Sequence, residues 1–371
     1  MAGSVRTERG FSSDFLFGDL TGAIGDSVTV LPIVVAIAVV TDLSLALILV
    51  WFGVFQIVWG GYYGVPISVE PMKALAGLLL AGAVTTGEFI VGGLLAGLVL
   101  VAIGLTGTLG KVRVLFGDRV VRGVQLGVAL LLLESGFGLA VSDPILATSA
   151  GAIALFVVAL GYRRLSGLVV LGVGGIVAFT QVGMPSMVLP SLAPGAHLSM
   201  HSVSEDMVGA TVGQLTMTIG NAAVATSLLL GDFYDRQVRP DSLSTSMGVM
   251  NLIAVPFGGV PMCHGSGGVA GKYAFGARTP NANLVLGVAY IVVAVTAVGL
   301  VAAYPLSMLG VILLIVALQL AHTSLKETTD YAFVVLVGVL SVLLNIGIAF
   351  LAAILIHLLL KRYTMPQIFN R

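Results

Sequence analysis

Two related segments interrupt the apolar sequence and limit how this chain can fold. Residues 65–77 read VPISVEPMKALAG, and residues 260–272 read VPMCHGSGGVAGK. The Val-Pro pair that opens the first segment returns 195 positions later, since 261 − 66 = 195. A residue that precedes proline avoids helical geometry, so both segments should begin extended.

Each extended strip should lead into a short helix. The strip at 67–69 precedes a second proline, which suits the first turn of a helix, so we predict a helix that begins at Glu70 or Pro71. The strip at 262–264 precedes a run of glycines, which permits close approach and unusual backbone geometry. The sequence therefore predicts two half-helices, each entered through an extended strip.

The remainder of the chain consists of long apolar runs. Only 9% of the residues are charged, 58% are hydrophobic and the mean hydropathy is +1.09, which excludes a soluble globular domain. At about 20 residues per crossing, the runs predict an all-α polytopic membrane protein with about fourteen transmembrane segments. We place these segments near residues 15–40, 44–62, 65–82, 88–109, 118–138, 144–161, 165–182, 207–230, 242–257, 260–274, 281–303, 304–321, 328–344 and 345–361.

The repeat extends beyond the broken segments. Residues 20–26, LTGAIGD, match residues 215–221, LTMTIGN, again at an offset of 195. We therefore divide the chain into repeats at 1–190 and 191–371, with seven segments in each. An odd number of crossings inverts the second copy, and inverted repeats are typical of secondary transporters with a site at the membrane midplane.

The basic residues predict the orientation. With the N-terminus cytoplasmic, every lysine and arginine except Lys73 is assigned to the inner side of the membrane. The first apolar segment contains Asp26 and no small-residue cleavage site, so we expect no signal peptide. The predicted location is the cytoplasmic (inner) membrane, with both termini inside.

The two half-helices predict an anion site. In inverted copies their N-termini point toward each other, and each offers free backbone N–H groups and about half a positive charge. Side-chain donors and flexible glycines nearby could complete the site; they are Ser68, Cys263, His264, Ser266, Gly265, Gly267 and Gly268. The alternative is that these glycines and prolines only serve helix packing.

Ionisable groups lie close to this predicted site. Glu70 is either a proton carrier or a cap of its own half-helix. Asp26 and Asn221 occupy matching positions in the two repeats, where they either approach the site or make a structural contact. Lys73 could neutralise an anion or pair with an acid, and His264 is a third candidate for proton coupling after Glu70 and Asp26.

Three motifs resemble the molybdate transporter family, a branch related to the sulfate permeases. They are VEPMKA at 69–74, VRGVQLG at 121–127 and PMCHGSGGVAGKY at 261–273, which is followed by FGART at 275–279. The likeness covers nearly the whole chain. Family members commonly carry glutamine at the position of Glu70.

The resemblance implies a core domain built from segments 1–4 and 8–11 and a gate domain built from segments 5–7 and 12–14. It also implies uptake of molybdate. Our main interpretation is a secondary transporter of tetrahedral oxyanions, molybdate first and then tungstate or sulfate, that works by alternating access. The expected substrate contacts are Asp26, Ser27, Ser68, Val69, Glu70, Pro71, Met72, Gln125, Asn221, Met262, Cys263, His264, Gly265, Ser266 and Gly267.

Several alternatives stay open at this point. The chain could be a sulfate or nucleobase carrier of the same superfamily, or an anion channel. An enzyme is not expected, since Cys263 and His264 alone do not make a catalytic constellation. We expect no cofactor, no bound metal and no nucleic-acid partner, and we leave a homodimer open.

Overall fold

The computed structural model describes residues 13–111, 117–183, 203–296, 298–301, 303–326, 328–344 and 346–364, and most of them are helical. The predicted connection at 183–206 falls largely outside these ranges. The first half contains α1 (Ser13–Val40), α2 (Leu45–Tyr63), β1 (Glu70–Pro71), α3 (Lys73–Leu80), α4 (Thr86–Thr106), α6 (Asp118–Ala140), α7 (Pro144–Ala159), η1 (Arg163–Leu165) and α8 (Ser166–Val182).

The second half follows a similar order. It contains α9 (Glu205–Met217), the π-helical stretch η3 (Thr218–Ala225), α10 (Thr226–Tyr234), α11 (Pro240–Ala254), η4 (Val255–Phe257), β2 (Met262–Cys263), α12 (Ser266–Ala274), α13 (Asn281–Thr296), η5 (Val298–Leu300), α14 (Leu306–Lys326), α15 (Tyr331–Leu343) and α16 (Ile346–Thr364). Each of the fourteen segments predicted from the sequence overlaps at least one of these helices, and the segment at 207–230 overlaps three.

Length and hydropathy identify a smaller set of clear membrane spans. Among the described residues, α2, α4, α6 and α14 are each long and apolar enough to cross a bilayer. The two parts of α1, joined at a bend of 43°, add a fifth if they count as one span. Four further apolar helices, α7, α8, α13 and α15, are shorter. The predicted count of fourteen crossings is therefore not established by helix length.

The bend in α1 has a local cause. Pro32 lies inside the helix. The first straight part ends at Val28 and the second begins at Val30. A proline ring collides with the carbonyl group four residues earlier, which here belongs to Val28, and it donates no hydrogen bond. The helix therefore turns at this point.

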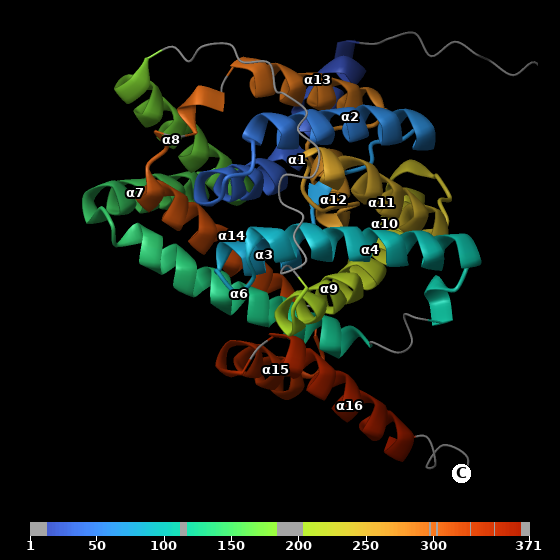
Figure 1. Cartoon of the computed structure of the whole chain (residues 1–371). Helices are drawn as coiled ribbons and strands as arrows, with labels where there is room; N and C mark the ends of the chain where they lie inside the picture. The colour runs from blue at the N-terminus through green and yellow to red at the C-terminus, as the bar shows by residue number, and fades with distance from the viewer. Residues whose placement is uncertain are drawn as a thin grey trace, which may run out of the picture.

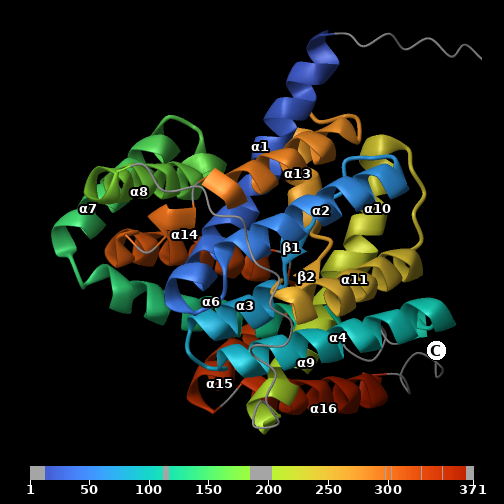
Figure 2. The same cartoon turned by 45° about the horizontal axis from the view of Figure 1, so that its top comes forward.

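The two extended strips pair with each other at the centre of the molecule (Figure 2). β1 and β2 are antiparallel, with Glu70 opposite Cys263 and Pro71 opposite Met262. The backbone N–H of Met72 also donates to the carbonyl of Pro261, at 2.8 Å. The two broken segments therefore run in opposite directions, as predicted.

This pairing also corrects the predicted start of the first half-helix. We expected α3 to begin at Glu70 or Pro71, but both residues belong to β1 and the helix begins at Lys73. The strand partner is almost 200 residues away, so local proline geometry could not reveal it. The second half-helix begins at Ser266, within the predicted glycine run.

The major helix pairings are reciprocal between the halves. α2 packs along α13, and α4 packs along α11. α6 packs along α14, while α7 and α8 lie together at one edge and α15 and α16 at another (Figures 1 and 2). Buried residues at the centre come from α1, α2, α3 and β1 together with α11, β2 and α12.

Candidate functional site

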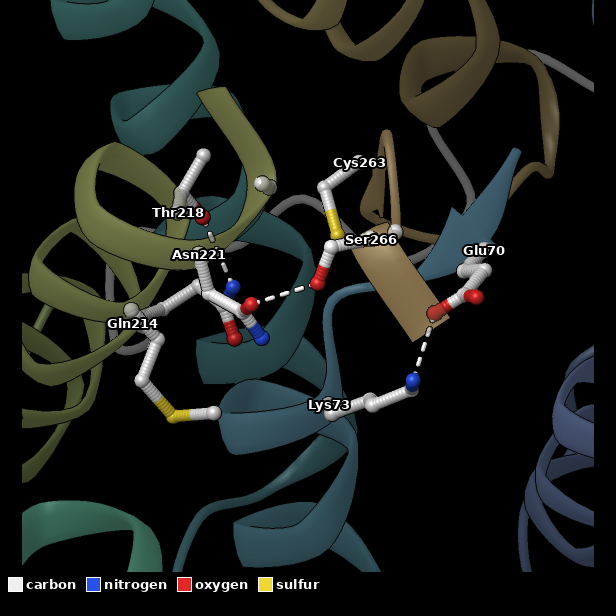
Figure 3. A pocket seen from close by; sticks show the side chains of 10 residues that line it. Glu70, Lys73, Gln214, Thr218, Asn221, Cys263 and Ser266 are labelled. Carbon is white, nitrogen blue, oxygen red and sulfur yellow. Dashed lines mark hydrogen bonds and ion pairs between the residues drawn. The ribbon is translucent and has the colours of Figure 1, made fainter. Parts of the chain in front are cut away.

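A cavity opens where the two half-helices face the π-helical stretch η3. Its volume is about 310 Å³ with its open mouth included. One wall is formed by the broken segments and the other by α9 and η3, as Figure 3 shows. The lining residues are Glu70, Lys73, Gln214, Met217, Thr218, Asn221, Ala222, Cys263, Gly265 and Ser266.

An ion pair forms part of this wall. Lys73 Nζ lies 2.5 Å from Glu70 Oε2. The glutamate side chain is 1% exposed and the lysine side chain is 22% exposed. The two residues are three positions apart, at the junction of β1 and α3. Because the charges cancel, the side chains of this pair bring no net charge to the cavity.

The N-terminus of α3 is already capped by a side chain. The Oε1 atom of Gln214 accepts hydrogen bonds from the backbone N–H groups of Ala74 and Leu75, at 2.8 and 3.1 Å. The Nε2 atom of the same residue donates to Thr218 Oγ1 at 2.8 Å. The helix N–H groups that we expected to bind the substrate therefore already donate to a side-chain oxygen of the protein.

The N-terminus of α12 is arranged differently. The hydroxyl of Ser266 donates to Asn221 Oδ1 at 2.6 Å, which ties the half-helix to η3. A β-carbon added at Gly267 would meet only Lys73 Nζ, at 3.9 Å, so the backbone there is open. A β-carbon at Gly268 would overlap the side-chain oxygens of Ser68, Asp26 and Glu70. Gly268 thus lets α12 pack closely against Ser68, Asp26 and Glu70, while Gly267 leaves the helix N-terminus open to the cavity.

The π-helical geometry of η3 places Asn221 at this wall. π-helical geometry is rare and frequently occurs at functional sites. Thr218 and Asn221 both belong to this stretch and both line the cavity. The two are labelled in Figure 3 on the helix facing the broken segments.

A second, fully buried network lies behind the cavity. Ser68 Oγ donates to Asp26 Oδ1 at 2.5 Å, and Asp26 Oδ2 lies 3.1 Å from Lys272 Nζ. Asp26, Ser68 and Lys272 are each completely buried or nearly so. Asp26 and Asn221 therefore make equivalent contacts, each with a serine of one broken segment.

Comparison with known proteins identifies the family of this chain. The model of a family described as "Molybdate transporter of MFS superfamily" matches the chain twice, over residues 18–132 and 206–320. Together the two matches cover more than half of the chain. The chain belongs to this family.

Curated members of the family align along most of their length. Molybdate transporter 1 of Arabidopsis thaliana is 28% identical over 92% of this chain and 88% of its own length. Molybdate transporter 2 of the same plant is 26% identical over 94% of this chain and 88% of its own. The chain is thus a multi-pass membrane protein related to transporters.

Solved structures identify the fold. The transmembrane domain of the cyanobacterial bicarbonate transporter BicA matches with a TM-score of 0.68 at 19% identity, over 91% of this chain and 97% of that one. The murine anion transporter Slc26a9, in an inward-facing state, matches with a TM-score of 0.71 at 14% identity, over 96% of this chain and 70% of that one. At these identities the likeness concerns the fold alone.

Of the expected substrate contacts, five line the cavity, and so does Lys73; the five are Glu70, Asn221, Cys263, Gly265 and Ser266. Gly267 lies beside it, next to Lys73. Asp26 and Ser68 lie behind Gly268 in the buried network. Pro71, Met72 and Met262 are held by the strand pairing, and Val69 accepts a hydrogen bond from Gln56 through its carbonyl oxygen, at 3.3 Å.

Three candidates have structural partners away from the cavity. His264 is fully buried, with Nδ1 2.8 Å from the carbonyl oxygen of Ser68 and Nε2 2.8 Å from Ser246 Oγ. Ser27 donates to the carbonyl of Ala23 at 3.1 Å. Gln125 lies on α6, where it contacts Arg122 at 3.1 Å and the carbonyl of Leu320 at 3.4 Å.

Several polar residues that surround these candidates were not predicted from the sequence. Lys272 was assigned to the inner side as an orienting charge, but its side chain is 0% exposed and lies in the core. Gln214 and Thr218 line the cavity, and Gln56 and Asn283 complete the network around Lys272. Polar side chains inside predicted spans are costly in lipid, and that alone could have marked them as functional candidates.

Proposed function

We propose that this protein is a secondary transporter that imports molybdate across the cytoplasmic membrane. The observation that carries the proposal is the cavity between the two half-helices and η3, in a chain that belongs to a molybdate transporter family. Polar and apolar groups line this cavity together with the Glu70–Lys73 ion pair, so its positive charge becomes available to an oxyanion only when Glu70 is neutral. Tungstate has the same shape and charge and is expected to compete.

Binding would use the open end of α12 and the lysine of the ion pair. The N-terminus of α12 supplies backbone N–H groups and about half a positive charge, and Asn221 and Thr218 face it. Lys73 approaches Gly267 from the other side. A tetrahedral anion between them could accept hydrogen bonds from both walls without displacing the buried network behind.

Alternating access would follow from the arrangement of the helices. The core domain would comprise segments 1–4 and 8–11, and the gate domain segments 5–7 and 12–14. The double family match, the antiparallel strips and the reciprocal packing of α2 with α13 and α4 with α11 support two inverted repeats of seven segments. Motion of the core against the gate would then carry the cavity from one side to the other.

Proton coupling would act through the ion pair. Molybdate carries two negative charges, and while Glu70 is ionised it neutralises Lys73. Protonation of Glu70 would release the lysine to the anion, so a proton and the substrate would move together. Asp26 and His264 are the second candidates, and both lie further from the cavity.

The orientation, with both termini cytoplasmic, and the oligomeric state belong to the proposal as well. A homodimer is compatible with the exposed apolar surface of a membrane protein but is not required by the cavity.

Binding and transport measurements test the function directly. Purified protein should bind molybdate and tungstate saturably, with weaker binding of sulfate and none of uracil. Proteoliposomes should take up molybdate with saturation kinetics and without the ionic currents of a channel. Binding of uracil in preference to molybdate would support a nucleobase carrier instead, and unsaturable anion conductance would support a channel.

A further inference from the structure

The buried side chain of Lys272 ends in a cage of four oxygen atoms. Its Nζ lies 2.5 Å from the carbonyl oxygen of Ile67, 2.8 Å from Gln56 Oε1, 3.1 Å from Asn283 Oδ1 and 3.1 Å from Asp26 Oδ2. These oxygens come from four separate elements: α1, α2, the first broken segment and α13. The lysine itself belongs to α12.

The two amide oxygens are held in place by their own nitrogens. Asn283 Nδ2 donates to Ile67 O at 2.7 Å and to the backbone oxygen of Gln56 at 3.0 Å. Gln56 Nε2 donates to Asp26 Oδ2 at 2.7 Å. Asn283 Nδ2 also donates to Gln56 Oε1, at 2.6 Å, so this oxygen accepts from Asn283 and from Lys272 together, while Asn283 Oδ1 accepts from Lys272.

Glycines bring the lysine to this cage. A β-carbon at Gly271 would collide with the backbone oxygen of Gly25, and a β-carbon at Gly25 with that of Gly271. The two helices therefore touch through their backbones one residue before Asp26 and Lys272. This contact lets the side chain cross from α12 into the space between α1, α2 and α13.

A cage of this composition is the kind that binds a monovalent cation. An ammonium group has three N–H donors, whereas four oxygens surround it, so a spherical ion could engage all of them. Carboxylate, amide and carbonyl oxygens are hard ligands that suit hard cations. One carboxylate balances one positive charge.

We propose that Lys272 is a tethered cation, and that its ammonium group fills a monovalent-cation site formed by Asp26, Gln56, Ile67 and Asn283. The covalent tether keeps the site occupied at every step of a transport cycle. The core domain of this protein thus needs no free Na⁺ or K⁺ at this position. The inference concerns the buried network and does not depend on molybdate being the substrate.

Removal of the tether should expose the site to free cations. Lys272→Ala leaves the cage and its carboxylate but creates a space for a small ion. We expect its melting temperature, measured in detergent at constant ionic strength, to be below that of the wild type in choline chloride and to rise in ammonium or methylammonium chloride. A bound ligand stabilises the folded state in proportion to its saturation, so the rise should be saturable and reach about 2–4 °C or more.

Three controls define the result. Wild-type protein and Lys326→Ala, an exposed lysine at the end of α14, should melt at the same temperature in choline as in ammonium or methylammonium chloride. The double variant Asp26→Asn with Lys272→Ala should lose the ammonium response, because the site then lacks its charge. An ammonium response that persists in the double variant would place the cation elsewhere and overturn the proposal.

Loss of folding is informative as well. If Lys272→Ala can be extracted as a monodisperse protein only when ammonium or a small alkali cation is present, the tethered-cation role is supported. If it aggregates in every cation while the neutral pair Asp26→Asn with Lys272→Met folds, the cage does not accept free ions and the proposal is wrong. A stable Lys272→Ala protein that ignores all cations would also refute it.

Discussion

Glu70 and Lys73 form an ion pair in the wall of the cavity, with 2.5 Å between Oε2 and Nζ. This ion pair gives Glu70 a partner at the proposed anion site. Glu70 alone would repel the substrate, but here it neutralises the one lysine among the lining residues. Under the proposed coupling, protonation of Glu70 releases that lysine to the anion.

A pH titration of binding tests this relationship. Molybdate affinity of the wild type should increase as the pH falls, because protonation of Glu70 removes a negative charge and frees Lys73. Glu70→Gln imitates the protonated acid, so it should bind at least as tightly as the wild type at neutral pH and depend much less on pH. The measurement is isothermal titration calorimetry across several pH values.

The same titration has a clear negative outcome. If the wild type and Glu70→Gln respond identically to pH, Glu70 serves only as a partner of Lys73 and the proton is carried elsewhere. Asp26→Asn and His264→Gln would then be titrated in the same way. Lys73→Met provides the matched control, since it should weaken binding at every pH.

Some of this arrangement could be predicted from the sequence. The breaks at Pro66 and Pro261 were found because proline and glycine act on their own backbone. The opposite directions of the two broken segments followed from the 195-residue repeat and are confirmed by the strand pairing. Asp26 and Asn221 were expected either to approach the site or to make a structural contact, and each contacts a serine of a broken segment, a partner that the sequence did not predict.

Other parts depend on which helices meet, and sequence patterns do not contain that information. The start of α3 at Lys73 is fixed by a strand almost 200 residues away. Lys272 was taken for a loop charge because it lies near the end of a predicted span, whereas its side chain points back into the core. The cap formed by Gln214 on α3 likewise requires two segments about 140 residues apart.

The two neighbouring glycines of α12 should respond differently to a side chain. Gly267 faces open space near Lys73, so Gly267→Val should fold and yet lose molybdate binding, because the side chain fills the approach to the helix N-terminus. Gly268→Ala should lower the melting temperature by several degrees, since its β-carbon would overlap Ser68, Asp26 and Glu70. Binding assays and thermal unfolding on both variants distinguish the two effects. Normal binding by Gly267→Val would exclude the α12 N-terminus as the site.

Basic residues in the loop before α11 should have no part in binding. Arg239 pairs with Asp241 at 3.5 Å and is 78% exposed, and Arg236 is also exposed. Charges in water are screened within about 10 Å at moderate ionic strength, so the double replacement with glutamine should change molybdate affinity by no more than about twofold. A tenfold loss would place the substrate at this loop rather than in the cavity.

The cap on α3 leads to the last prediction. Gln214 presents an uncharged oxygen to the N–H groups of Ala74 and Leu75 while its nitrogen binds Thr218. Gln214→Glu has nearly the same shape and keeps an oxygen at the helix N-terminus, where a negative charge is favourable. The variant should therefore retain its melting temperature. Its added charge lies in the cavity, however, and should weaken binding of a dianion by at least about tenfold, which corresponds to about 1.4 kcal/mol.

Gln237→Glu is the control that separates the effect of a charge in the cavity from the effect of adding a charge anywhere in the protein. Gln237→Glu introduces the same charge in the loop between α10 and α11, where the side chain is exposed, and should leave affinity unchanged.

Gln214→Ala supplies the opposite test, because it removes the cap without adding charge and opens two backbone donors to the anion. It should cost about 1 kcal/mol of stability, the usual effect of losing a helix cap, and preserve or improve binding. If Gln214→Glu binds molybdate as tightly as the wild type, the anion does not enter the space between α3 and η3, and the substrate contacts must be confined to α12.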